Sequence, residues 1–357
     1  MKTQQILWQQ LEQNNLVSGE YQKPELLNTP WFVKILLALS GWFTSLLIFV
    51  FCLLILYDIV ESSILCITIG SGFILLAYSL LKKIPNEFIE HLMLATSLAG
   101  QALIAWALFA NDWLSSPLMS CLIIFILQSG LAIVMPHYVH RVCSALFASI
   151  ALVMSFHLLN ISLLSNATLL FLATLLVLNE WRFPKLQPSL EAISYGIILV
   201  IIPLQASTSL GYEISYWLSE HNNSPIINHY LDQVLLMTIM LYLVVTLIKR
   251  SHFVFPMISR ISLIGATMGF CLLSIKAPGI TIGLAILVLG FSNSNRILQG
   301  LGICSLLYYI SSYYYFLELT LLQKAASLFV VGLFLLLLRV LLLKFANPLQ
   351  SGVNDEA

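Results

Sequence analysis

Charged side chains are scarce in this chain of 357 residues. Asp, Glu, Lys and Arg together make up 9% of it, whereas about 25% is usual for a soluble domain. Hydrophobic residues make up 59%, and the acidic and basic residues cancel to a net charge of zero. A protein that binds nucleic acid needs a basic surface, and this balance provides none. The composition therefore favours a protein embedded in a lipid bilayer and argues against a nucleic-acid partner.

Motifs for catalysis are also lacking. The sequence contains no HExxH, no GxxxxGK[ST] and no GxSxG, since residues 290–294 read GFSNS. Every Asp and Glu falls at the end of a predicted membrane span or in a loop, so no acid or base is placed at mid-bilayer. We therefore expect a protein that is not an enzyme and that uses no cofactor.

The cysteines show no pattern of pairing. None forms a CxxC motif, and all six lie inside apolar runs, where a thiol packs as a small hydrophobic group: Cys52, Cys66, Cys121, Cys143, Cys271 and Cys304. We expect neither disulfides nor a metal site from them.

The N-terminal 30 residues lack a short apolar core followed by a cleavage site. We therefore expect no removable signal peptide, and the first membrane helix would itself direct insertion. The chain divides into a short cytoplasmic segment (1–30), a transmembrane helical domain (31–344) and a cytoplasmic tail (345–357).

Long, continuous apolar runs dominate the rest. Strands of a membrane barrel alternate over about 10 residues, whereas a spanning helix needs about 20 apolar residues. The runs predict an all-α, polytopic transmembrane bundle of about twelve spans: 33–57, 62–81, 88–110, 114–136, 142–159, 162–178, 192–210, 233–248, 261–275, 280–292, 297–312 and 323–343. The pair at 261–292 is short and flanks Lys276–Gly279. It is either two thin spans or a re-entrant pair, and a single broken helix would reverse the orientation of everything after it.

Basic residues orient the predicted spans. With the N-terminus inside, all of the sixteen basic residues except Lys276 and Lys324 lie on inner segments or at inner span ends. Such a bias is what the positive-inside rule requires. We therefore predict that both termini are cytoplasmic.

The stretch from Tyr308 to Arg339 is the richest in markers. It holds five of the fourteen tyrosines between two apolar runs, and tyrosine rings settle at the headgroup level. We interpret it as an outer turn with an interfacial belt, in which Glu318 and Lys324 pair. The candidate functional residues of this turn are Tyr313, Tyr314, Glu318, Thr320 and Lys324.

Other polar residues receive structural interpretations. The amides inside predicted spans favour interhelical hydrogen bonds over substrate binding: Gln101, Gln128, Gln205 and Gln299. His137 and His140 have no further ligands nearby, so we interpret them as interfacial histidines instead of a metal site. The outer loop 211–232 contains Glu220, His221, His229 and Asp232, whose spacing matches no known metal pattern. Gly265 and Gly269 form a GxxxG motif, which lets another helix approach closely.

Two segments resemble a known family. The N-terminal LWQQLEQNNLVSGE with Thr29–Val33, and the C-terminal YYYFLELTLLQKAASLFVVG, are similar to the bacterial membrane family called domain of unknown function 4401. Glu318 and Ala325 stand where the family pattern has Asp and Ser. The resemblance covers nearly the whole chain and implies a multi-pass protein of the bacterial inner (cytoplasmic) membrane, with no established activity.

Two functional hypotheses follow. The first is a non-enzymatic membrane component that acts with a membrane or periplasmic protein partner in an envelope process. The alternative is a permease for a neutral or apolar small solute, which the number of spans, the interrupted pair at 261–292 and Pro203 within a span favour.

Overall fold

The computed structural model describes residues 62–83, 87–110, 116–209, 225–250, 257–274 and 279–316, with isolated helical positions between 33 and 51 and between 322 and 340. Regular structure in these ranges is helical throughout, which confirms the all-α prediction. The elements are α4 (Ser63–Lys83), α5 (Glu87–Ala110), α6 (Pro117–Val134), α7 (Tyr138–Leu158), α8 (Leu164–Asn179), the 3-10 turn η1 (Glu180–Arg182), α9 (Gln187–Ser209), α11 (Pro225–Arg250), α12 (Met257–Ser274), α13 (Ile280–Ser292) and α14 (Arg296–Phe316).

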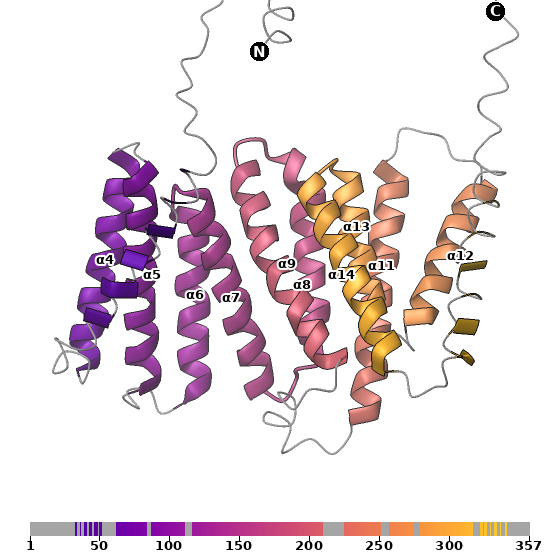
Figure 1. Cartoon of the computed structure of the whole chain (residues 1–357), viewed down its shortest axis with the longest axis horizontal. Coiled ribbons are helices and arrows are strands. Elements are labelled where there is room, and N and C mark those ends of the chain that lie inside the picture. The colour runs from indigo at the N-terminus through magenta and orange to yellow at the C-terminus, as the bar shows by residue number, and fades with distance from the viewer. Residues whose placement is uncertain are drawn as a thin grey trace, which may run out of the picture.

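The helices stand side by side with roughly parallel axes, from α4 and α5 at one end of the molecule to α12 at the other (Figure 1). Seven of the described helices, α4–α9 and α11, are long and apolar enough to cross a membrane, and shorter apolar helices lie within α12 and α13. A multi-span membrane protein is thereby confirmed. The count of twelve spans stays a prediction, because most of 33–57 and 323–343 lies outside the described residues.

Helix α11 is longer than its predicted span, 233–248. It begins at Pro225, because proline fits the first helical position, where its missing N–H is not needed. The segment predicted as the outer loop, 211–232, therefore includes the first turns of α11. Asp232 lies inside α11 and is the second residue of the candidate span Leu231–Arg250.

The uncertain pair at 261–292 forms two helices, α12 and α13, which contact one another. The 13 residues of α13 extend about 20 Å at ~1.5 Å per residue, short of the ~30 Å hydrocarbon core. Gly279 begins α13 with φ of 100°, and a Cβ there would lie 2.6 Å from the ring of Tyr309. Only glycine fits both the left-handed backbone and the close ring.

Glycines bring particular helix pairs close together. A Cβ on Gly70 of α4 would lie 2.6 Å from the carbonyl oxygen of Gly100 in α5, and the reverse distance is also 2.6 Å. Between α13 and α14, Gly290 meets the backbone of Gln299, and Gly302 meets that of Leu287. Small residues at a helix interface allow this close packing where the hydrophobic effect does not drive association.

The apolar core is divided. A large cluster fills the space between α8, α9, α11 and α13, and includes Ile198, Leu236 and Ile286. A small cluster of Ile74, Ile104, Leu108 and Met135 joins α4 and α5 to the α6 side. Between α5 and the neighbouring pair α6 and α7, buried polar side chains and a cavity take the place of continuous apolar packing.

Candidate functional site

Three helices direct polar side chains into one seam of the bundle. Ser97 and Gln101 lie one turn apart on α5, and His140 and Ser144 lie one turn apart on α7. Residues four apart share a helix face, so each pair faces the same neighbour. Gln128 of α6 completes the group, and all five side chains are buried.

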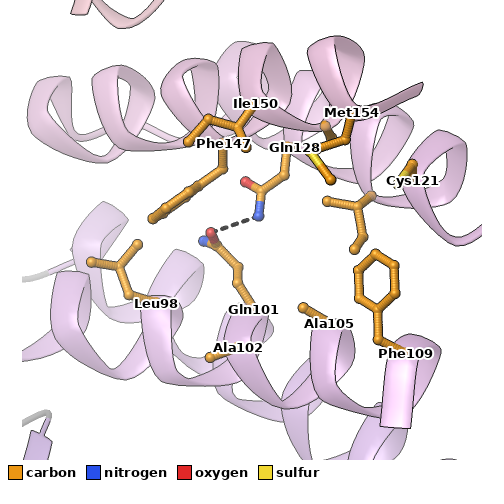
Figure 2. Close-up of a pocket in the computed structure, with 12 residues that line it drawn as sticks. Leu98, Gln101, Ala102, Ala105, Phe109, Cys121, Gln128, Phe147, Ile150 and Met154 are labelled. Carbon is orange, nitrogen blue, oxygen red and sulfur yellow. Dashed lines mark hydrogen bonds between the residues drawn. The ribbon is translucent and has the colours of Figure 1, made fainter. Parts of the chain in front are cut away.

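These side chains form one chain of hydrogen bonds. Gln128 Nε2 donates to Gln101 Oε1 at 2.9 Å, as Figure 2 shows. Gln101 Nε2 lies 3.2 Å from His140 Nε2, and the Ser97 hydroxyl lies 2.7 Å from the same ring nitrogen. The Ser144 hydroxyl lies 3.2 Å from His140 Nδ1. The network therefore links α5, α6 and α7.

His140 lies at the centre of this network. Its ring is 0% exposed, and both of its nitrogens lie within hydrogen-bonding distance of polar groups. These contacts offset the cost of burying a polar ring.

A cavity of about 280 Å³ adjoins this network, between α5, α6 and α7. Besides Gln101 and Gln128 its wall is made of apolar side chains and one thiol, that of Cys121 (Figure 2). Its volume lies near the lower end of the range for small-molecule sites. The cavity can hold a compact molecule of mostly hydrocarbon character.

One polar atom of the wall is unsatisfied. Gln128 is 4% exposed, and its Oε1 has no hydrogen-bond partner among the described residues. Its amide group faces the space between Gln101 and Phe147 in Figure 2. A buried acceptor left unpaired costs about 1–3 kcal/mol. A ligand that donates a hydrogen bond to this oxygen, once a small side-chain shift uncovers it, would recover that free energy.

The cavity opens on the side of the bundle. Phe109, Phe147, Ile150 and Met154 line it and are also among the exposed large hydrophobic side chains. In a membrane these side chains face lipid, because they lie on spanning helices α5 and α7. The geometry suits a molecule that enters from the hydrocarbon region, and the wall residues carry no charge to bind an ion.

The amide predictions can now be compared with the structure. Interhelical bonding by Gln101 and Gln128 is confirmed, as is that of Gln299, whose Nε2 donates to the carbonyl of Gly290 at 3.2 Å. Gln205 is buried in α9. The sequence reasoning missed Ser97 and Ser144, although their spacing of four from Gln101 and His140 was a usable signal.

The two histidines differ from each other. The interfacial interpretation of His140 was wrong, because the ring is buried between helices. His137 precedes α7, and its Nε2 lies 3.7 Å from a carboxylate oxygen of Glu90. Burial lowers the pKa of His137 below the ordinary value, although the Glu90 charge acts in the opposite direction.

The predicted outer turn is only partly described by the structure. Tyr313 and Tyr314 belong to the last turn of α14, whereas Glu318, Thr320 and Lys324 lie outside the described residues, and their pairing stays a prediction. The interpretation of the tyrosines as an interfacial belt was wrong for Tyr309. It is 1% exposed, and its hydroxyl donates to the carbonyl of Ile202 at 3.0 Å.

The outer-loop residues whose spacing matches no metal pattern are only partly described. Glu220 and His221 lie outside the described residues, as does the side chain of His229. In the part of the chain that the structure places, no three or more His, Cys, Asp or Glu residues gather in a metal-binding group.

The helices and their composition define a class: a multi-span, all-α membrane protein with an apolar cavity inside the bundle. Residues 30–345 match the family described as Domain of unknown function (DUF4401), and the chain belongs to that family. The resemblance seen in the terminal segments is thereby confirmed. Neither a curated protein nor a solved structure matches the chain.

Proposed function

We propose that the protein binds a neutral, mainly apolar small molecule in the cavity between α5, α6 and α7, and carries it within or across the bacterial inner membrane without changing it chemically. The observation that supports this proposal is an apolar wall with one unpaired acceptor, Gln128 Oε1. A ligand with a hydrocarbon body and one hydroxyl or N–H donor fits both features.

The packing around the cavity is suited to movement. Helix α4 packs mainly on α5, through the Gly70–Gly100 approach, whereas α5 makes few close contacts with α6 and α7. Hydrogen bonds among Gln101, Gln128 and His140 cross this seam. The α4–α5 pair can therefore shift as a unit while its own tight contact is kept.

A matched pair of probes tests the proposal: para-butylphenol, which has a hydroxyl donor, and its methyl ether, which has none. We expect the full chain in lipid nanodiscs to bind the phenol more tightly than the ether. Gln128→Leu should lower the ratio of the two affinities by about tenfold, because one buried hydrogen bond contributes roughly 1.4 kcal/mol.

Two tryptophan variants control for partition of the probes into lipid. Ala105→Trp fills the cavity and should abolish saturable binding, whereas Leu75→Trp adds the same ring on the exposed face of α4 and should not. Equal binding by wild type and Ala105→Trp would exclude the cavity as the binding site.

A role with a protein partner is the second candidate. Helix α12 supports it, because a Cβ on Gly265 of the GxxxG motif would meet no described atom within 4 Å. Purification in mild detergent followed by mass spectrometry tests this role. A stoichiometric membrane protein that is lost with Gly265→Leu would favour it, and a protein recovered alone would count against it.

A further inference from the structure

A second buried polar site lies on helices that do not form the cavity. Asn166 is near the N-terminus of α8, and Asp232 is in α11, which packs against α8. Asn166 Nδ2 donates a long hydrogen bond of 3.4 Å to Asp232 Oδ2. Asn166 is 5% exposed and Asp232 is half-buried, so the pair is largely shielded from solvent.

The other oxygens of this pair lack partners. Asp232 Oδ1 and Asn166 Oδ1 are buried and accept no hydrogen bond from any described residue, and the same holds for the neighbouring Ser165 Oγ. Asn166 Nδ2 contacts Asp232 Oδ2, while the other amide oxygen and the other carboxylate oxygen have no donor. Such unpaired oxygens are expected at a site that binds a cation through oxygen ligands.

The charges point the same way. Among the side chains that the structure describes, which do not include His229 on the same helix, no Lys, Arg or His forms an ion pair with Asp232. A buried carboxylate near the end of a candidate span is costly unless it is paired. A single carboxylate balances one positive charge, so a divalent ion would leave an excess charge in the bilayer.

We propose that Asp232 and Asn166 hold a monovalent metal cation, with Ser165 as an additional oxygen ligand. Carboxylate, amide and hydroxyl oxygens are the hard donors that such ions prefer. The site is separate from the α5–α6–α7 cavity and does not depend on the function proposed for it. If the cavity does carry a solute, a cation bound between α8 and α11 is placed to be coupled to that movement.

Binding of radioactive sodium to the purified full chain in nanodiscs tests the proposal, with choline chloride keeping the ionic strength constant. We expect saturable binding to wild type and at least about a tenfold loss of affinity in Asp232→Asn, because the only charged ligand is removed. Asn166→Leu should also weaken binding, whereas Asn166→Ser, which keeps an oxygen, should weaken it less.

Glu90→Gln is the matched control, because it removes one negative charge at a distant position on α5. It should bind sodium like wild type. Asp232→Asn is judged to be folded when its helical circular dichroism and its unfolding transition match those of the wild type. If this variant does not fold, the comparison of Asn166→Leu with Asn166→Ser decides. Equal sodium binding by wild type and Asp232→Asn, an equal loss in Glu90→Gln, or preference for calcium would each overturn the proposal.

Discussion

Gln101 joins three partners in the seam, as many as His140 does. It accepts from Gln128 and lies within hydrogen-bonding distance of both Ser97 and His140. In a bilayer such bonds stabilise helix association only modestly, because the separated helices find other polar partners. The network is therefore better understood as a means of orienting the Gln128 amide at the cavity than as the main source of stability.

A double-mutant cycle measures this orienting contact. Gln101→Leu should lower the free energy of unfolding by about 1–3 kcal/mol, because it leaves Gln128 Nε2 unpaired. In the Gln101→Leu background, Gln128→Leu should lower the free energy of unfolding by less than it does in the wild type. The difference, which is the coupling free energy, should be about 0.6–1.7 kcal/mol. Unfolding in a detergent titration gives these values.

Gln299 provides the control for that cycle. It also makes an interhelical hydrogen bond, but to Gly290 between α13 and α14, so Gln101→Leu and Gln299→Leu should be additive. If Gln101 and Gln299 show a coupling free energy as large as that of Gln101 and Gln128, the coupling is not specific to the seam.

At the scale of helices, the tightness of packing differs from one pair to the next. Glycine contacts bind α4 to α5 and α13 to α14, and Gly196 of α9 lies against the backbone of Val142 in α7. By contrast, Gly130 of α6 has open space beside it. The pairs with glycine contacts should behave as rigid units, with the cavity at the looser junction between them.

Gly70→Ala tests the α4–α5 contact. The added Cβ would lie 2.6 Å from Gly100 O and 2.9 Å from Ile104 Cγ1, so the helices must separate, and we expect a loss of about 1–3 kcal/mol. Gly72→Ala on the same helix meets nothing within 4 Å and should be neutral or stabilising. Unfolding titrations compare the two; equal effects would show that α4 and α5 are not in close contact.

For the whole molecule, orientation in the membrane is the property with the most consequences. It decides from which side Asp232 is reached, and the distribution of basic residues predicts that the turn before α8 is outside and the segment before α9 is inside. These segments lie at opposite ends of α8.

Single cysteines placed in these segments test the orientation. In a background with the native cysteines replaced, we expect Ser162→Cys to react with an impermeant maleimide in intact spheroplasts. Lys185→Cys, which is also exposed, should react only after lysis. The reverse pattern would invert the predicted topology and place Asp232 on the cytoplasmic side.

Much of the architecture could be predicted from the sequence, because a bilayer leaves a chain few choices. Long apolar runs must become helices so that every backbone N–H and C=O is bonded internally, and the described helices follow those runs closely. The terminal motifs also identified the family. Interhelical roles for Gln101, Gln128 and Gln299 followed from the high cost of leaving an amide unpaired in hydrocarbon.

Only the tertiary structure decided which polar groups meet. His140 is 39 residues from Gln101, and Asp232 is 66 residues from Asn166, and helix packing alone sets such pairings. Periodicity could not reveal that Tyr309 turns inward while Tyr308 stays exposed, because α14 is apolar or aromatic on several faces. The cavity, too, arises where packing between α5 and α6 is incomplete, and no single helix encodes that gap.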